Sequence, residues 1–576
     1  MENRSSGSSE RTPYVVFWLM AFVVILWGLG FRELWGSEDR WAEISRVMLK
    51  SGNIFHPLIN GEVYFDKPLL GYWLIVGLGY LTGFMDEWIV RLPSAIFAIA
   101  GLWGTMFIGR KLWSERTGIT AGWFLLTTYG FIFWSRTATA DIENLACIIL
   151  ALAWYWAREK KPGFLTYFVF YLICFLGAHT KGLISVIIPL LALAPDLIRE
   201  KRWKIHLRTS HFLAGAAALA IYLLPFLLAS MNTPDSGLTA TLHGSRESGL
   251  YMVFRENIER FFKPFDHAEP FYIYLYYLPF LLLPWVVLFV SGAIEMFPSI
   301  RKASRPDAWL MWTLIVVFLF FTASGSRRGY YILPILPFCA LLCAVYWEKR
   351  PESALKKISL CILKICFVLL ALLETASPLL WPLAKAYIGF TPPALLLYMT
   401  PVIGILALAI IFSTRMISDI SDSITGTEQR IAPLILAAAV FFAGFFCIQM
   451  TAVDIFRSEK SFAFKLKKAA RCIKPSEIAF YLKVPPDLLF YMDLPGNVSV
   501  LKKSDELEAF VKAGKGILVS QRGYFEYLLP LLPDKMAQNP SFTENMHPWE
   551  KKRKSQKHAV WILKKAEEET LSPQKP

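Results

Sequence analysis

Long blocks of apolar residues alternate with short polar segments over most of this 576-residue chain. The blocks run for about 17–25 residues with few charges, which is the length at which an α-helix crosses the hydrocarbon core of a bilayer. This pattern predicts a polytopic α-helical membrane protein with about thirteen transmembrane helices. The predicted spans cover residues 13–31, 90–108, 117–134, 142–157, 164–178, 182–198, 212–231, 271–295, 308–322, 330–346, 357–384, 394–413 and 432–452.

One further apolar piece, Leu69–Leu81, is ambiguous because it is short and contains three glycines. The positions of Lys and Arg decide how it is treated, since short cytoplasmic loops of membrane proteins are rich in these residues. If the N-terminus is cytoplasmic and this piece does not cross, nearly all basic short loops, such as 110–116 and 199–208, fall on the cytoplasmic side. We therefore expect an interfacial or re-entrant helix there, with extracytoplasmic loops at 32–89 and 232–270.

The composition changes after about residue 455, where the transmembrane domain (1–455) is expected to end. Short segments rich in β-forming residues alternate with a helix that begins near Ser504 with an early acidic turn. The predicted strands are 478–484, 497–501, 516–520 and 559–564. This alternation predicts a small C-terminal α/β domain over residues 456–576, on the extracytoplasmic side.

Composition and charge agree with the membrane class. Hydrophobic residues make up 55% of the chain, against about 45–50% in soluble domains, and the mean hydropathy is +0.43. A net charge of +15 would indicate a nucleic-acid partner in a soluble protein, but here the basic residues gather in short loops, so none is expected. Most of the eight cysteines lie in apolar blocks and have no metal-site spacing, so no disulfide framework is expected either.

The stretch from Ser37 to Arg46 directly follows the first span and holds three carboxylates and two arginines. Ionisable side chains at a membrane edge are costly and often functional. In a helix beginning near Ser37, Arg40, Glu43 and Arg46 share one face because they are three residues apart. The residues alone fit two structures equally well: an ordinary surface helix with ion pairs, or a carboxylate site at the membrane edge.

Five cations fall on the predicted outer side, where positive charge is least expected. They are Lys67, Lys181, Arg260, Arg327 and Arg328. Any one of them could be structural, as a snorkelling lysine is, but a bound anion such as a lipid phosphate or pyrophosphate accounts for them together. Asp141 begins a span on the same side, where it is either a helix-start acid or part of a site. Acids beside phosphate-binding cations indicate group transfer from a lipid phosphate, with a carboxylate as base.

Several stretches match a known order of motifs. Glu38, Arg40 and Ala42–Arg46 match Asp-Glu-x-Arg-Tyr-Ala-Glu-Ile-Ser-Arg, and Gly61 with Tyr64–Pro68 match Gly-x-x-Tyr-Phe-Glu-Lys-Pro. Further matches follow at Thr180–Gly182, Ile258–Phe261, His267, Pro270, Phe271 and Tyr331–Pro334. Over about residues 10–340 the chain therefore resembles the GT-C membrane glycosyltransferases, namely the bacterial aminoarabinose (lipid A) transferases and the dolichyl-phosphate-mannose-protein mannosyltransferases. The resemblance is weak beyond about residue 350.

The resemblance implies a GT-C fold and an inverting transfer of an aminoarabinose- or hexose-type sugar from a polyprenyl-phosphate donor such as undecaprenyl phosphate. The acceptor would be lipid A, another envelope glycan or a protein, at the outer face of the bacterial inner (plasma) membrane among its lipids. No nucleotide sugar would be used. The residues implied in substrate binding are the five outer cations together with Arg40, Glu43, His267 and Tyr330.

The first-loop acid of the family would act as the base toward the acceptor hydroxyl. Here Ser37 stands where the family has its leading Asp, so that role passes to Glu38 and Asp39 jointly. Asp141 resembles the second acid of the family and is expected to orient the first site.

Two other functions fit parts of the pattern. A transporter or flippase of a lipid-linked sugar is the alternative, although such proteins tend to show repeated halves and polar breaks at mid-membrane, and neither is evident here. An oligosaccharide ligase using a lipid pyrophosphate is a third reading. No cofactor is required, and a divalent metal is possible, with Asp66, Asp141 and His267 as weak candidate ligands.

Overall fold

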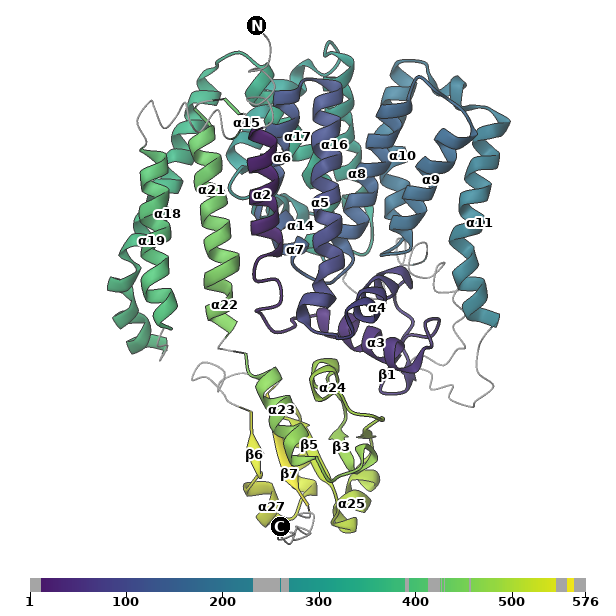
Figure 1. Cartoon of the computed structure of the whole chain (residues 1–576), viewed down its shortest axis with the longest axis vertical. Helices are drawn as coiled ribbons and strands as arrows, with labels where there is room; N and C mark the ends of the chain where they lie inside the picture. The colour runs from purple at the N-terminus through teal and green to yellow at the C-terminus, as the bar shows by residue number, and fades with distance from the viewer. Residues whose placement is uncertain are drawn as a thin grey trace, which may run out of the picture.

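The computed structural model describes residues 12–231, 259, 269–388, 393–412, 425, 427–428, 430–454, 457–544 and 557–563. The long helices lie side by side, and the C-terminal segment lies beyond one end of them, opposite the end at which α2 begins (Figure 1). In chain order the helices of this layer, short and long, are α2 (Thr12–Leu26), α5 (Glu87–Leu112), α6 (Glu115–Leu126), α7 (Tyr129–Ser135), α8 (Asp141–Arg158), α9 (Phe164–Ala178), α10 (Ile184–Arg199), α11 (Thr209–Met231), α14 (Ile273–Leu281), α15 (Val286–Met296), α16 (Arg305–Ala323), α17 (Leu336–Lys349), α18 (Ala354–Ile388), α19 (Ala394–Ile411), α21 (Ala432–Gly444) and α22 (Met450–Val453).

Each predicted span falls on one or two of these helices, but not every helix is long and apolar enough to cross a membrane alone. Within the described residues seven helices are, or eight if the bent pair α14 and α15 forms one span. Both α2 and α9 are apolar but only 15 residues long. Helix α8 holds Asp141, Glu143 and Arg158 within its 18 residues. The multi-span helical class is therefore confirmed, while the number thirteen stays a prediction.

Two predicted spans are broken rather than continuous. Residues 117–134 divide into α6 and α7 at Thr127 and Thr128, whose hydroxyls donate to the carbonyls four residues earlier at 2.6 Å each. Residues 271–295 divide into α14 and α15, whose axes differ by 117°. Pro284 lies in that break and has no N–H for a helical hydrogen bond, which is a common cause of a kink.

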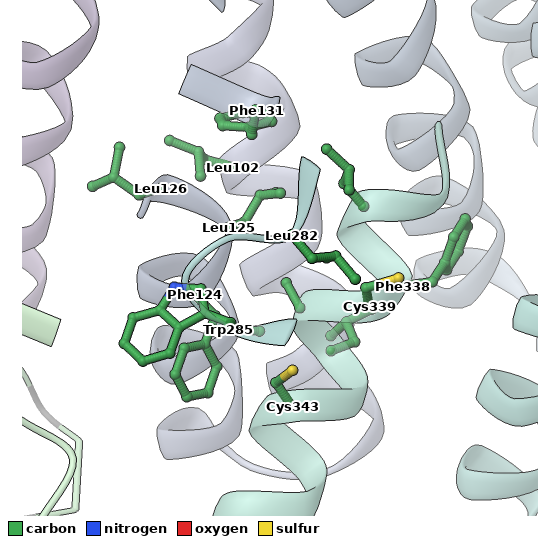
Figure 2. Close-up of a cluster of buried hydrophobic side chains, with 14 of the residues drawn as sticks. Leu102, Phe124, Leu125, Leu126, Phe131, Leu282, Trp285, Phe338, Cys339 and Cys343 are labelled. Atoms are coloured by element: carbon green, nitrogen blue, oxygen red, sulfur yellow. The ribbon is translucent and has the colours of Figure 1, made fainter. Parts of the chain in front are cut away.

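The helices pack around a buried apolar cluster that joins α5, α6, α15 and α17. Figure 2 shows part of it, with Phe124 beside Trp285 and the two cysteines of α17 nearby. The ring centroids of Phe124 and Trp285 are 4.7 Å apart, and the Trp285 indole donates to the Thr127 hydroxyl at 2.9 Å. A Cβ on Gly109 would lie 2.8 Å from the Cα of Gly118, so α5 and α6 touch backbone to backbone. Small residues allow such close helix packing in membranes.

A pair of shorter helices lies at the end of the helix layer that faces the C-terminal segment (Figure 1). Helix α3 (Glu38–Ser51) carries the acidic motif, and α4 (Leu70–Thr82) is the ambiguous apolar piece. Trp41 of α3 packs against Tyr72 of α4, with their ring centroids 4.4 Å apart. The short hairpin β1 (Leu58–Ile59) and β2 (Glu62–Val63) follows α3. With 13 residues and a place beside α3, α4 fits the expectation of a helix that does not cross.

The C-terminal segment contains a five-stranded sheet in the order β4-β3-β5-β7-β6. Strand β3 pairs in parallel with β4 and β5, whereas β7 is antiparallel to β5 and β6. The strands are β3 (Ile478–Tyr481), β4 (Ser499–Leu501), β5 (Ile517–Gln521), β6 (Phe542–Thr543) and β7 (His558–Ile562), close to the predicted segments except for β6, which was not predicted. The helices are α23 (Glu459–Ala469), α24 (Pro486–Met492), α25 (Ser504–Ala513), α26 (Phe525–Leu528) and α27 (Asp534–Gln538).

Contacts between α24 and the first loop hold this sheet against the helices. The Tyr491 hydroxyl accepts from the Leu34 backbone N–H at 2.9 Å. Just after α24, Asp493 pairs with Arg46 of α3 at 2.9 Å. Two parts of the chain separated by more than 400 residues therefore meet at α3.

Candidate active site

A cavity of ≈790 Å³ lies where the helices meet the C-terminal segment. We call it the large cavity. Its walls come from three distant parts of the chain. The polar residues among them are Ser37, Asp39, Arg40, Asn60, Glu62 and Tyr64 from the first loop, Thr137, Thr139, Arg328 and Tyr330 from turns between helices, and Lys483 and Lys502 from the C-terminal segment.

Glu38, one of the two predicted bases, is bound inside the protein rather than lining this cavity. Its side chain is fully buried, and its two oxygens accept from Arg91 Nε and a terminal nitrogen at 2.7 and 2.8 Å. The backbone N–H groups of Trp35 and Ala138 also donate to it, each at 2.9 Å. Burial alone would raise the pKa of Glu38, but Arg91 holds it at about 2. This carboxylate is ionised and fully occupied, which is a structural role.

Asp39, the other predicted base, lines the large cavity. One of its oxygens accepts from the Arg40 backbone N–H at 2.7 Å, while the Arg40 guanidinium pairs with Asp66 instead. Burial, together with the nearby carboxylate of Asp487, raises the pKa of Asp39 to about 7. A carboxylate whose pKa lies near the working pH is suited to take a proton from a hydroxyl group.

Arg40 joins the acidic motif to the second motif, Tyr64–Pro68. Its guanidinium pairs with Asp66 at 3.2 Å, donates to the Tyr64 hydroxyl and lies 5.5 Å from the centre of that ring. The Lys67 ammonium donates to the Asp66 carbonyl at 2.9 Å. The Asp66 carboxylate is thus neutralised by Arg40, and Arg40 is fixed at the cavity wall.

A second cavity of ≈120 Å³ contains the two predicted outer lysines. We call it the lysine cavity, and Lys67, Lys181, Asp141 and Tyr331 line it. Lys181 forms an ion pair with Asp141, and its ammonium lies 5.0–5.1 Å from the ring centres of Tyr330 and Tyr331, within cation–π range. The fold therefore brings together three charged residues that the sequence pattern marked as candidates.

Tyr330 connects the two cavities. Its ring contacts Lys181 on one side, and its hydroxyl accepts from Arg328 at 3.0 Å on the other. The ring centroids of Tyr330 and Tyr331 are 5.2 Å apart. Tyr330 lines the large cavity, and Tyr331 lines the lysine cavity. Asp39, whose pKa is raised, thus faces the large cavity, and Lys67 and Lys181 face the adjoining lysine cavity.

Other predicted site residues have different partners or are not placed. Both oxygens of Glu43 accept from Arg46 at 2.7 and 2.8 Å, so Glu43 supports the contact between α3 and α24. Arg327 donates to the carbonyls of Glu269, Thr322 and Ser324, and so caps the end of α16. These contacts give Glu43 and Arg327 a structural role, and their part in substrate binding stays a prediction. The predictions at Arg260, at His267 and over most of the loop 232–270 lie outside the described residues.

The chain is similar to known transferases of lipid-linked sugars. The family model for dolichyl-phosphate-mannose-protein mannosyltransferase matches residues 66–228. The undecaprenyl phosphate-α-4-amino-4-deoxy-L-arabinose arabinosyl transferase 2 of Sodalis glossinidius is 30% identical over 370 residues, which cover 62% of this chain and 63% of that protein. The corresponding transferase of Enterobacter sp. is 29% identical, covering 58% of this chain and 59% of its own length. The matches therefore span less than two thirds of these relatives.

The solved structures extend the likeness to the whole fold. ArnT from Cupriavidus metallidurans, bound to undecaprenyl phosphate, aligns with a TM-score of 0.72 at 18% identity over 96% of this chain and 98% of its own. This chain has the GT-C fold. The archaeal oligosaccharyltransferase AglB from Archaeoglobus fulgidus aligns more loosely, with a TM-score of 0.51 at 11% identity over 90% of this chain. The family resemblance indicated by the motifs is confirmed.

The residues of this GT-C chain offer little for a metal ion. Within the described ranges no three His, Cys, Asp or Glu side chains gather closely enough to hold one. Of the weak candidates, Asp66 pairs with Arg40 and Asp141 pairs with Lys181. Each carboxylate already has a cation, so neither offers a free charge to a divalent ion.

Two sets of residues in this GT-C site were missed by sequence reasoning. Arg91 lies in α5, within a predicted span, and a buried charge at that place could have been flagged as unusual. Lys483 and Lys502 belong to loops of the C-terminal segment more than 400 residues from Asp39. No local pattern marks them, because only the folded chain brings them to the large cavity.

Proposed function

We propose that this protein is an inverting glycosyltransferase that takes its sugar from a polyprenyl phosphate. The observation that carries the proposal is the pair of adjoining cavities, one holding Asp39 and the other holding Lys67 and Lys181. A base and an anion-binding site are the two parts that such a transfer needs. The printed names of the relatives, which are undecaprenyl-phosphate arabinosyl transferases, support an aminoarabinose- or hexose-type sugar.

Asp39 is the base in this proposal. The acceptor hydroxyl gives its proton to the Asp39 carboxylate while its oxygen forms a bond to the anomeric carbon from the face opposite the phosphate. The bond between that carbon and the phosphate oxygen breaks, and its electron pair leaves with the polyprenyl phosphate. Because attack and departure occur on opposite faces, the anomeric configuration inverts. Glu38 takes no part in the chemistry and instead fixes the start of α3 through Arg91.

The lysine cavity binds the donor phosphate. Lys67 and Lys181 would neutralise the charge that grows on the phosphate as the sugar leaves, which stabilises the transition state. Asp141 is a positioning residue, since it holds the Lys181 ammonium over the two tyrosine rings. The acceptor, whether lipid A, another envelope glycan or a protein, would enter the large cavity from its side toward Lys483 and Lys502.

The same proposal includes the arrangement in the membrane. The N-terminus would lie on the cytoplasmic side of a bacterial inner membrane. Thirteen spans over residues 1–455, an odd number, would then bring the chain to the opposite side. The loops 32–89 and 232–270 and the domain 456–576 would then lie on the extracytoplasmic face with both cavities. The start of α2 lies toward the end of the helix layer opposite the C-terminal segment, which supports this orientation (Figure 1).

Transfer by the purified protein tests the function. A panel of polyprenyl-phosphate sugars is offered with lipid A, envelope-glycan and protein acceptors, and the products are followed by mass spectrometry. We expect transfer from the lipid-linked donors and none from nucleotide sugars. Movement of the donor across a proteoliposome membrane without transfer to any acceptor would overturn the proposal in favour of a flippase.

A further inference from the structure

A small cavity of ≈20 Å³ lies apart from the two cavities described above. It is found where the ends of α7 and α22 meet residues 28–32, and we call it the arginine cavity. Three arginines, Arg32, Arg91 and Arg136, line it together with Thr451 and apolar neighbours. A cavity needs about 10–15 Å³ to hold one water molecule, so this one has room for a single small particle.

Arg136 is the least compensated of the three. It is only 6% exposed, and one terminal nitrogen donates to the carbonyls of Val24 and Ile25 at 2.8 and 3.0 Å. Its guanidinium also lies 5.8 Å from the centre of the Phe446 ring. In the described part of the chain no carboxylate lies within ion-pair distance of it, and its other nitrogens have no protein acceptor. Burial lowers the pKa of Arg136 to about 10, which still leaves it charged at neutral pH.

The carboxylates near the two neighbouring arginines do not compensate the charge of Arg136. Arg91 uses all its nitrogens on Glu38 and on three backbone carbonyls. Arg32 reaches Glu38 only at 3.4 Å. Asp454, the next carboxylate along, accepts from the Glu33 backbone N–H and pairs with Arg457. Among the described residues, Glu38 is thus the only carboxylate at ion-pair distance from Arg32 or Arg91, Asp454 acts on Arg32 from farther away, and neither pairs with Arg136.

We propose that a single inorganic anion of chloride size occupies the arginine cavity between Arg136 and Arg32. An unpaired buried charge is costly, and an anion there would remove the excess without any movement of the chain. The cavity is too small for a phosphate group, so this site is distinct from the proposed donor site and does not depend on the proposed function. The anion would join the carbonyl end of α2, the end of α7 and the loop that presents Glu38.

Thermal unfolding of the full-length protein in detergent tests the proposal. Chloride is titrated against gluconate at constant ionic strength, because a ligand that binds only the folded state raises the melting temperature as its concentration increases. We expect a saturable rise of a few degrees for the wild type and none for Arg136→Gln. The matched control is Arg110→Gln, since Arg110 is half exposed and pairs with Glu115 at 3.6 Å; this variant should keep the full chloride response.

A second measurement decides the case if Arg136→Gln does not fold. Crystals of the wild type grown in bromide should show an anomalous peak between Arg136 and Arg32. A flat chloride titration of the wild type, an equal response in Arg136→Gln, or a cavity with no bromide peak would each overturn the proposal. The last result would mean that Arg136 simply caps α2 with the help of water.

Discussion

Replacing Glu38 by Gln separates a structural role from a chemical one. Glu38 is fully buried and contacts Arg91 at 2.7 and 2.8 Å. Among the described residues it is the only carboxylate at ion-pair distance from that arginine, which is 1% exposed. Removing one partner of a buried ion pair typically costs about 3–5 kcal/mol because a charge is left uncompensated. Arg91 would keep its three carbonyl contacts, so we expect about 3 kcal/mol for Glu38→Gln.

Reversible unfolding of the purified protein in mixed micelles measures this loss. The control is Asp534→Asn, which removes an exposed carboxylate from α27 and should leave stability within about 0.5 kcal/mol. The double variant Glu38→Gln/Arg91→Met should be less destabilised than the sum of the single variants, since it no longer contains a lone charge. If Glu38→Gln is as stable as the wild type yet abolishes transfer, the assignment of Glu38 to structure is wrong.

Four further results are expected. The pKa of Glu38 is lowered to about 2, so the stability it contributes should be fully present above its unfolded pKa of about 4.3 and be lost as the pH falls from there through about 2, as acid titration of unfolding will show. The pKa of Asp39 is raised to about 7, so the transfer rate should rise as the pH increases through that value and the base loses its proton. Because the folded state disfavours the ionised form of Asp39, Asp39→Asn should be more stable than the wild type at pH 8. Lys67→Met removes a cation from the lysine cavity and should weaken binding of polyprenyl phosphate about 10- to 100-fold in direct binding assays, the value of hydrogen bonds to charged groups. Asp493→Asn should cost less than about 1 kcal/mol of unfolding free energy, because this partner of Arg46 is 44% exposed and such pairs are weak.

The helices and the general location of the site follow from the sequence because they depend on local patterns. Apolar block length identifies the helical segments, and the excess of acids and outer cations points to one end of them. The broken span at 271–295 could have been anticipated from Pro279 and Pro284. The apolar run was nevertheless long enough to suggest a single helix.

The choice between Glu38 and Asp39 could not be made from the sequence. The two carboxylates are adjacent, so a helix directs them to different surroundings, and only the fold shows that one meets Arg91 and the other a cavity. Arg91 is 53 residues away from Glu38. The same limit applies to Lys483 and Lys502, whose place at the large cavity depends on how α24 docks on α3.

The most direct test of the central claim is the transfer rate of Asp39→Asn with a saturating polyprenyl-phosphate sugar. Loss of a general base typically lowers a rate about 10²- to 10⁴-fold, and we predict a loss in that range with donor binding unchanged, because Asp39 does not line the lysine cavity. The Asp534→Asn variant should transfer at the wild-type rate. Wild-type transfer by Asp39→Asn would contradict the account, since the other described first-loop carboxylate at the large cavity, Glu62, pairs with Lys502 at 3.3 Å.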